Sequence, residues 1–398
     1  MIPFVDHDSP DEIPSQALRP APASRSASFS AGTSPGNNVA VSNILRNFAV
    51  KTTKHPALKF YKLLKLITGN TPGPLKLIGM AAMMRLNRRM IGIFMDPVMA
   101  CNLRCRMCYF SDPERRKEMH GVMSESQLAD IEKSLYRNTL KLQIGCGAEP
   151  TLSPMLKRIV AGAKAYGVPN ISLVTNGQLL AGDKIDLAEL AETGLNELIL
   201  SLHGTHKETY EFLMTNAHWE NFQALVKKIA EVKKRFPKFS LRINYTVNSL
   251  NVDDLEGDIF WSIWGDAQPD TIQLRPVQNV GDTAWNDFDL TPLKEKYDST
   301  IGAIIAESRR RGITIIAPGP EHLDAVDNIQ DAYSAVVEDT SYCYVSPSSC
   351  YKPDFDPKAG TFADYHRRHH TVRHLLKSAF TAHSRSRHAT KKLNYKVK

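Results

Sequence analysis

Three cysteines with C-x3-C-x2-C spacing lie close together in the chain: Cys101, Cys105 and Cys108. An apolar run, residues 90–95, comes shortly before them, so we expect the cysteines on a loop that leaves a buried strand. A tight loop can turn all its thiol groups inward onto one metal centre, and the thiolate is the form that binds metal. The spacing therefore predicts a metal site on this loop.

The number of cysteines limits the kind of metal site. A structural zinc or an ordinary four-iron cluster has four protein ligands and no open position. With three protein ligands, one metal position stays open for a small molecule. Two other interpretations fit the cysteines alone: a Cys3His zinc site with His120 as fourth ligand, and three unrelated buried cysteines.

The cysteine spacing resembles that of the radical S-adenosylmethionine (radical SAM) superfamily of enzymes. The resemblance implies that Cys101, Cys105 and Cys108 hold a [4Fe-4S] cluster, and that its open iron binds S-adenosylmethionine (SAM). It also implies an electron donor of the flavodoxin or ferredoxin type, whose electron cleaves SAM to a 5'-deoxyadenosyl radical that abstracts a substrate hydrogen. Met107 departs from the family, which usually has an aromatic residue just before its third cysteine.

Further motifs follow in the family's order. Residues 147–150 resemble its GGEP stretch with alanine as second residue, residues 175–177 its TNG, and residues 201–204 its S-x-D-G with His203 in place of the acid. We expect His203 to have a structural role, with its hydrogen bonds made within the protein. The resemblance implies cofactor-binding residues in these motifs and at the end of the fifth strand: Gly147, Ala148, Glu149, Pro150, Thr175, Asn176, Ser201 and Asn248.

Strand and helix patterns alternate between the cysteine loop and about residue 310. We expect five strands after the first, at 140–145, 171–175, 197–202, 240–247 and 271–277, and helices at 124–138, 153–166, 187–192, 207–235, 253–264 and 292–310. Such alternation predicts the α/β class with a parallel sheet. The resemblance implies a partial (β/α)6 TIM-like barrel over residues 91–312, with a helical N-terminal flank and a small C-terminal extension.

Polar residues on the last two strands are candidates for the site, because parallel barrels carry their chemistry at the carboxyl ends of the strands. Arg242, Asn244, Thr246 and Asn248 alternate with apolar residues and therefore share one face of their strand. Arg275, on the sixth strand, is a candidate for binding a substrate or cofactor carboxylate. An equal alternative is that these residues only pack inside the barrel and satisfy hydrogen bonds there.

The basic residues are concentrated in two flanks. Residues 41–95 contain ten Lys and Arg and no acid, and residues 366–398 contain another ten and no acid, so the remainder carries 8 − 20 = −12. We expect a disordered tail over 1–40, a basic amphipathic helical segment over 41–90 and a basic tail over 366–398. These flanks could face an anionic partner such as a membrane surface or an acidic peptide, a nucleic acid is not the expected partner, and solvated surface helices are the alternative.

Two further cysteines, Cys343 and Cys350, lie beyond the expected barrel. Their position is similar to that of the SPASM/twitch extension of some radical SAM enzymes, whose extra cysteines hold auxiliary clusters. Two cysteines cannot complete such a cluster, so we expect residues 313–365 to form a SPASM-like extension without full cluster ligands, which caps the barrel.

The cysteine usage and the N-terminal residues indicate a reducing, cytoplasmic setting, peripheral to a membrane if the flanks bind lipid. No run approaches the ~18 apolar residues of a membrane span. The predicted function is a radical SAM enzyme that modifies a peptide or a natural-product-type small molecule. Two alternatives are a zinc-stabilised nucleic-acid-binding or interaction module without catalysis, and a SAM-binding barrel that serves as an assembly partner.

Overall fold

The computed structural model describes residues 71–277, 283, 289–320, 323, 329–381, 387–389 and 396–397. All of them belong to one compact unit, Thr53–Lys398. The tail expected over 1–40 lies outside the described residues, as do residues 41–70 of the expected basic helical segment.

A ten-stranded sheet with the order β10-β9-β1-β2-β3-β4-β5-β6-β7-β12 forms the centre of this unit. Strands β1 to β7 pair in parallel with their neighbours, and β9 pairs in parallel with β1. The bounds are β1 Ile91–Met95, β2 Thr139–Ile144, β3 Asn170–Thr175, β4 Glu197–Leu202, β5 Ser240–Val247, β6 Thr271–Pro276, β7 Thr314–Ala317, β9 Tyr342–Ser346, β10 Ser349–Cys350 and β12 Lys396–Val397. Strands β8 (Ile329–Asp331) and β11 (Arg387–Ala389) form a separate antiparallel pair.

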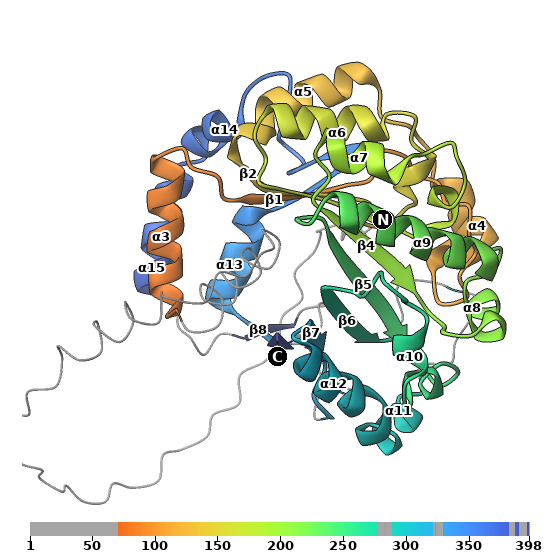
Figure 1. The fold of residues 1–398 in the computed structure, drawn as a ribbon. Coiled ribbons are helices and arrows are strands. Elements are labelled where there is room, and N and C mark those ends of the chain that lie inside the picture. The colour runs from red at the N-terminus through yellow and green to blue at the C-terminus, as the bar shows by residue number, and fades with distance from the viewer. Residues whose placement is uncertain are drawn as a thin grey trace, which may run out of the picture. The chain divides into compact units, whose positions relative to one another are not determined.

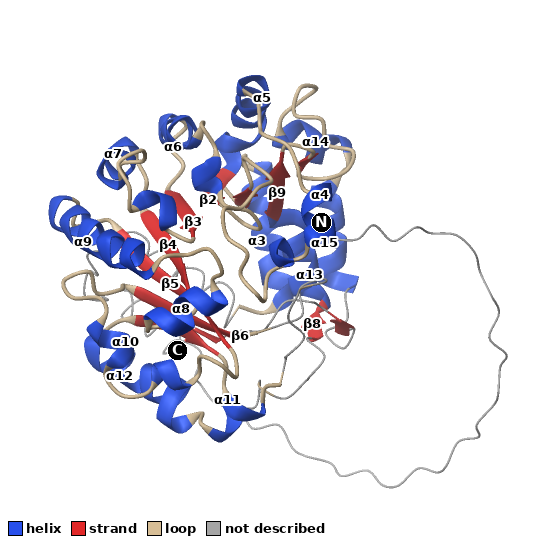
Figure 2. Ribbon diagram, turned by 90° about the vertical axis from the view of Figure 1, so that its right-hand side faces the viewer, coloured by secondary structure: helices blue, strands red, loops and turns tan. Residues whose placement is uncertain are grey.

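Helices connect the successive parallel strands and lie along one side of the sheet (Figures 1 and 2). Their bounds are α4 Pro113–Glu118, α5 Glu125–Leu135, α6 Leu156–Ala165, α7 Leu187–Thr193, α8 Lys207–Leu213, α9 Trp219–Arg235, α10 Ile259–Ser262, α11 Thr291–Glu295 and α12 Ala303–Arg311. The fold is therefore mixed α/β with a mostly parallel sheet, as expected for a partial TIM-like barrel.

The alternation predicted for the fifth strand is present in β5. Leu241, Ile243, Tyr245 and Val247 are fully buried, and the Tyr245 ring packs edge-on against Phe260 of α10. Because side chains alternate across a strand, Arg242, Asn244 and Thr246 lie on the opposite, inward face of the sheet. The inward face of β5 is therefore polar.

Sequence periodicity located the helices well but not always their ends. Ser124 caps α5 through a capping box with Gln127, as predicted. The single helix expected over 207–235 is instead two helices, α8 and α9, separated at residues 214–218, where Asn216 has a φ of 75°. The Glu211 carboxylate accepts the Trp219 N–H at 2.9 Å and so serves the start of α9. This tertiary contact has no signature in the apolar period.

Two other expected helices are shorter and irregular. The region 253–264 contains a 3-10 turn, Asp253–Leu255, followed by α10. The region 292–310 consists of α11, a π-helical turn at Asp298–Gly302, and α12.

The residues after β7 add to the same sheet. Residues 342–346 form β9 at the outer edge of β1, so the segment expected to cap the barrel extends the sheet instead. Next to this edge, α3 (Gly73–Arg85) packs against α13 (Ala332–Ser341) and α15 (Thr371–Thr381), and α14 (Phe362–Arg368) precedes α15. Cys343 is fully buried in the core. Cys350 is half-buried and packs against the same core.

Candidate cofactor site

The cysteine loop leaves the carboxyl end of β1, as predicted, and is held by the break between α8 and α9. The backbone N–H groups of Arg104 and Arg106 donate to the carbonyls of Thr215 and Leu213 at 2.9 and 3.0 Å. The Arg106 guanidinium also lies over the Phe212 ring, 3.7 Å from its centroid. Carbonyl groups at the break between α8 and α9 thus accept hydrogen bonds that hold the cysteine loop in place.

Apolar side chains anchor the same loop from within. Leu103 is 1% exposed in the main core, and Met107 packs against Leu213 and Val277. Met107 stands where the resemblance leads one to expect an aromatic residue, and its role here is packing. The hydroxyl of Tyr109 instead reaches the next loop and donates to the Gly147 carbonyl.

The three cysteines of the loop are half-buried and close enough that neighbouring thiols affect Cys101 and Cys105. Burial raises the pKa of Cys101 to about 12, with the charges of Glu149 and Cys108 acting in the same direction. Burial also raises the pKa of Cys105 and of Cys108, and the two other thiols raise that of Cys105 further. A buried thiolate needs a compensating positive charge, which a metal centre supplies.

The thiols do not converge on a single point. Within the described part of the chain, no three Cys, His, Asp or Glu side chains are placed to hold one metal ion. A cuboidal cluster binds each thiolate through a different iron, so it needs the three sulfurs around one volume rather than at one point.

Asp96, the residue after β1, organises the turn that follows β2. Its buried carboxylate accepts the N–H groups of Cys146, Gly147 and Ala148 at 2.7, 3.0 and 3.3 Å, and the Tyr344 hydroxyl of β9 at 2.9 Å. Successive N–H groups that point to one side form a nest for an anion. Here the nest is filled by the chain's own carboxylate, so the N–H groups of the turn are already used.

Gly145 makes the turn possible. Its φ is +91°, and a Cβ at this position would lie 2.4 Å from the Val174 carbonyl oxygen. A side chain is therefore excluded by both conformation and space.

Glu149 joins the ends of β2 and β3 instead of facing a ligand with its carboxylate. The carboxylate accepts the Thr175 hydroxyl at 2.7 Å and the Asn176 N–H at 2.9 Å, and also bonds to Thr151. Burial raises the pKa of Glu149, while these hydrogen bonds lower it in part. Thr175 and Pro150 are buried in the same junction.

Asn176 connects this junction to the cysteine loop. Its amide Nδ2 donates to Asn102 Oδ1 at 2.9 Å and lies 4.0 Å from the sulfur of Cys101. The Leu103 N–H also points at that sulfur, at 3.4 Å. Among the predicted cofactor-binding residues, Asn176 is the one that the structure brings directly to a cysteine of the triplet.

The remaining predicted residues lie at the ends of β4 and β5. Ser201 is half-buried on the inward face of β4. Asn248 is fully buried, and its Oδ1 accepts the Leu250 N–H at 2.9 Å. Its Nδ2 has no hydrogen-bond partner within the ranges that the structure describes, which is unusual for a buried amide.

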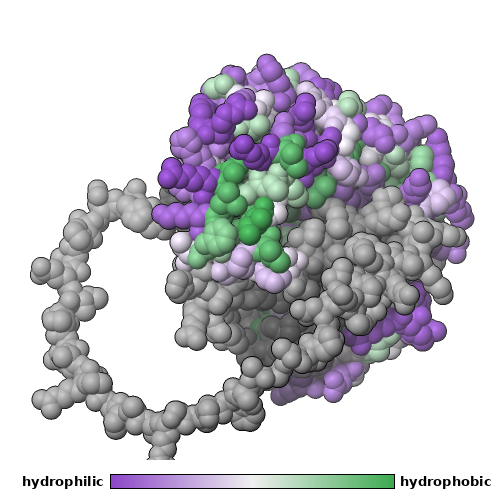
Figure 3. Space-filling model, turned by 90° about the vertical axis from the view of Figure 1, so that its left-hand side faces the viewer, coloured by the Kyte–Doolittle hydropathy of each residue, from purple (hydrophilic) through white to green (hydrophobic). Residues whose placement is uncertain are grey.

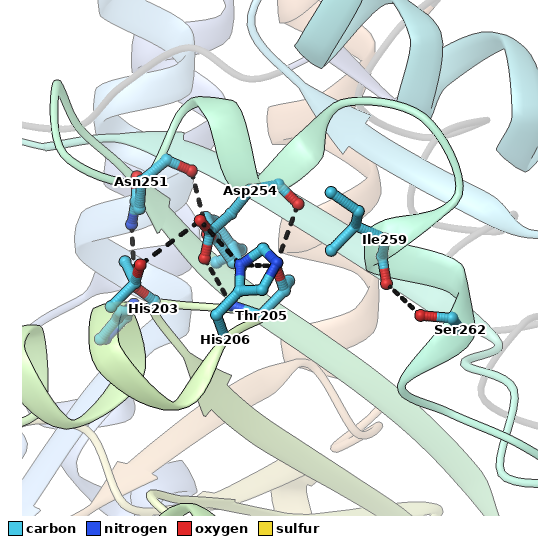
Figure 4. Close-up of polar contacts among 9 residues, drawn as sticks. His203, Thr205, His206, Asn251, Asp254, Ile259 and Ser262 are labelled. Carbon is cyan, nitrogen blue, oxygen red and sulfur yellow. Dashed lines mark hydrogen bonds and ion pairs between the residues drawn. The ribbon is translucent and has the colours of Figure 1, made fainter.

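His203 makes the kind of structural contacts that the sequence suggested, and the structure shows its partners. Its Nδ1 accepts the Thr246 N–H at 3.2 Å, and Asn251 bonds to its carbonyl at 3.0 Å (Figure 4). Burial, with a contribution from Arg275, lowers the pKa of His203 to about 4. The ring is therefore neutral near pH 7, with its proton on Nε2.

A second polar group holds the loop after β4. Asp254 accepts the Thr205 N–H at 2.6 Å and lies 3.3 Å from Nδ1 of His206 (Figure 4). On the inward face, Gln273 Oε1 accepts both Arg242 and Arg275, the latter at 2.9 Å. The two guanidinium groups therefore lie close together at this side of the sheet.

Sequence reasoning missed Asp96 and Tyr344. An acid directly after a predicted parallel strand is a signal that could have identified Asp96, because site residues gather at that end. Tyr344 had no such signal, since its position depends on β9 pairing with β1.

A parallel sheet with a three-cysteine loop at the carboxyl end of its first strand is the architecture of a radical SAM domain. The family model described as Radical SAM superfamily matches residues 95–259. Residues 95–259 therefore carry a radical SAM domain, and the enzymes of this superfamily use a [4Fe-4S] cluster and SAM.

Individual relatives are distant. The chain is 25% identical over 249 residues to a probable GTP 3',8-cyclase of Methanococcus maripaludis strain C7, covering 61% of this chain and 75% of that protein. It is 28% identical over 199 residues to a probable GTP 3',8-cyclase of Saccharolobus islandicus strain Y.N.15.51, covering 50% of this chain and 61% of that protein.

A solved structure shares the fold at lower identity. The crystal structure of Streptococcus suis SuiB bound to S-adenosylmethionine matches with a TM-score of 0.50 at 13% identity, covering 78% of this chain and 68% of that one.

Proposed function

We propose that this chain binds its [4Fe-4S] cluster through Cys101, Cys105 and Cys108 and uses it to start radical chemistry on a polar substrate. Held by these cysteines, a reduced cluster would supply the electron for reductive cleavage of SAM to methionine and a 5'-deoxyadenosyl radical, the species that would abstract a substrate hydrogen. The observation that carries the proposal is the loop after β1, which brings three half-buried cysteines together at the carboxyl end of the first parallel strand.

The protein around these thiols suits thiolate ligands. The Leu103 N–H and the Asn176 amide both approach the sulfur of Cys101, and donors to a sulfur stabilise its anionic form. Leu103 and Met107 exclude water from the inner side of the loop. This combination of donors and apolar cover is what a cluster with one open iron requires.

The turn after β2 supports a role in holding SAM through its backbone. Asp96 accepts three N–H groups of this turn, so a methionyl ammonium would bind its carbonyl oxygens, of which that of Gly147 also accepts the Tyr109 hydroxyl through one of its two lone pairs. Ala148 carries only a methyl group, while the space beside Gly147 admits the Tyr109 hydroxyl, which bonds to its carbonyl. Glu149, Pro150 and Thr175 act in this proposal by fixing the junction behind the turn.

Two groups at the ends of β4 and β5 complete the proposed cofactor site. Ser201 offers a hydroxyl to the ribose or carboxylate of SAM. Asn248 offers a buried amide Nδ2 that lacks a partner in the described ranges, as expected of a donor reserved for a ligand.

The substrate class follows from the inward face of β5 and β6. Arg242, Asn244, Gln273 and Arg275 make this face polar and cationic, which supports a peptide or a polar small molecule as substrate. The two archaeal relatives are named for a reaction of GTP, a polar anionic small molecule. A flavodoxin or ferredoxin type protein is the proposed reductant.

The test is anaerobic reconstitution with iron and sulfide. The wild-type chain should hold about four iron per chain and, with dithionite and SAM, release 5'-deoxyadenosine. The triple variant with Cys101, Cys105 and Cys108 replaced by Ala should lose both. The matched control is Cys146→Ala, which removes an exposed thiol from the neighbouring turn and should keep its iron.

Wild-type iron content in the triple variant would overturn the ligand assignment. A colourless protein that binds zinc instead would favour the interaction-module alternative.

A further inference from the structure

Two acid-free, basic segments far apart in the sequence meet on one face of the protein. The helix α3 belongs to the segment 41–95 and α15 to the segment 366–398, and the two helices pack against each other. Each segment contains ten Lys and Arg and no Asp or Glu. The fold therefore concentrates positive charge that the sequence keeps in two separate places.

The outer side of this helix pair is apolar. Leu75 and Leu86 of the α3 region are 56% and 67% exposed, and Leu376 and Phe380 of α15 are 39% and 80% exposed. Figure 3 shows apolar side chains gathered on this side of the molecule, bordered by hydrophilic ones. We call these four residues, with the basic residues around them, the basic apolar face.

The exposed apolar residues of α3 recur with the helical period, so they form one continuous stripe on the helix. Leu75, Gly79, Ala82 and Leu86 are separated by four, three and four residues, and all are exposed. The opposite side of α3 buries Leu77, Met80 and Ala81 in the core. Both sides of α3 are thus apolar, and only one of them is covered by the described residues.

Basic side chains surround these apolar groups. Arg85, Arg88, Arg373 and Lys377 are all exposed, and none forms a salt bridge with another described residue. An exposed apolar surface bordered by these basic side chains is complementary to an anionic bilayer surface, although α13, which packs against both helices, adds the acids Glu338 and Asp339.

We propose that the basic apolar face binds the surface of an anionic lipid bilayer. Leu86, Leu376 and Phe380 would enter the headgroup boundary, while the basic residues pair with lipid phosphates. A second copy of the chain fits less well, because a twofold contact would set one basic border against another. No described helix is long and apolar enough to cross a bilayer.

The experiment is vesicle flotation of the full chain with neutral phosphatidylcholine vesicles and with vesicles that also contain phosphatidylglycerol. We expect binding to the anionic vesicles only, with release as salt rises, because the attraction is screened over ~10 Å at 0.1 M salt. The charge variant is Arg373→Glu/Lys377→Glu and the apolar variant is Leu376→Ser/Phe380→Ser. Each should weaken binding by about tenfold or more.

Two matched controls separate the face from general properties of the chain. Lys227→Glu/Lys238→Glu changes the net charge by the same amount at exposed positions on and beyond α9, which lies at the right of Figure 1 while α3 and α15 lie at the left. Ile259→Ser removes an exposed apolar side chain from α10. Both should bind as wild type does, and circular dichroism should show that all variants are folded.

Equal binding to neutral and anionic vesicles, or no binding at low salt, would overturn the proposal. It would also fail if the α9 control lost as much binding as the α15 charge variant. If the α15 variants changed only the sedimentation mass, the face would belong to a second copy. Deoxyadenosine formation, measured without lipid, should be unchanged in the variants, so this outcome is independent of the proposed function.

Discussion

Replacement of Asp96 should separate the stability of the cofactor turn from the presence of the cluster. The Asp96 carboxylate is 1% exposed and accepts the N–H groups of Cys146, Gly147 and Ala148 as well as the Tyr344 hydroxyl. A hydrogen bond to a charged group contributes about 1.5–3 kcal/mol, and such bonds to one acceptor are not additive. We expect Asp96→Ala to lower the free energy of unfolding by about 4 kcal/mol.

Asp96→Asn should cost about half as much. The amide oxygen can take the place of Oδ1, which lies within 3.3 Å of all three N–H groups, and the Tyr344 hydroxyl can reverse to accept from the amide. What is lost is mainly the charge, which roughly doubles the strength of such bonds. Tyr344→Phe removes one of four donors and should cost about 1 kcal/mol.

Urea unfolding of the three variants measures these differences, and SAM affinity of the reconstituted proteins measures the consequence for the site. We expect Asp96→Asn to keep wild-type iron while it binds SAM more weakly, since the turn moves and the cysteine loop does not. A loss of 1 kcal/mol or less for Asp96→Ala would refute the reasoning. So would an Asn variant less stable than the Ala variant.

Two further predictions concern the C-terminal region. The double variant Cys343→Ser/Cys350→Ser should keep about four iron per chain, because both cysteines pack in the core beside β1; a fall from about eight to about four on iron analysis would show an auxiliary cluster. Burial lowers the pKa of His366 from 6.5 to about 4, so the folded state resists its protonation. Stability should therefore fall by about 3 kcal/mol as pH drops from about 6.5 to about 4. His366→Gln should flatten this decline in pH-dependent urea unfolding, and an unchanged slope would contradict it.

The strands were predictable because their apolar runs are local. The ranges 197–202 and 240–247 coincide with β4 and β5, and the capping box at Ser124 was visible in four consecutive residues. The break between α8 and α9 was not predictable, because both helices bury an apolar side and the period continues across the gap. The residues that use the break, Arg104 and Arg106, lie more than 100 residues earlier.

The residues of the candidate site likewise fall into those that local patterns predict and those that they do not. The cysteine triplet and the turn at 147–150 could be found from spacing and resemblance. The contribution of Asp96 depends on N–H groups 50 to 52 residues further along, and that of Tyr344 on a strand pairing across 248 residues. Local patterns carry no information about such contacts.

The parallel pairing of β9 with β1 has a consequence for synthesis of the chain. During translation, the outer edge of β1 stays unpaired until residue 346 has left the ribosome, about 250 residues after β1 itself. An unpaired apolar strand edge is a template for aggregation, and pairing over such a sequence separation is slow. A chain that stops before residue 342 would leave this edge open permanently and would also lack the Tyr344 contact to Asp96. Nascent chains of intermediate length should therefore depend on chaperones more than the finished protein does.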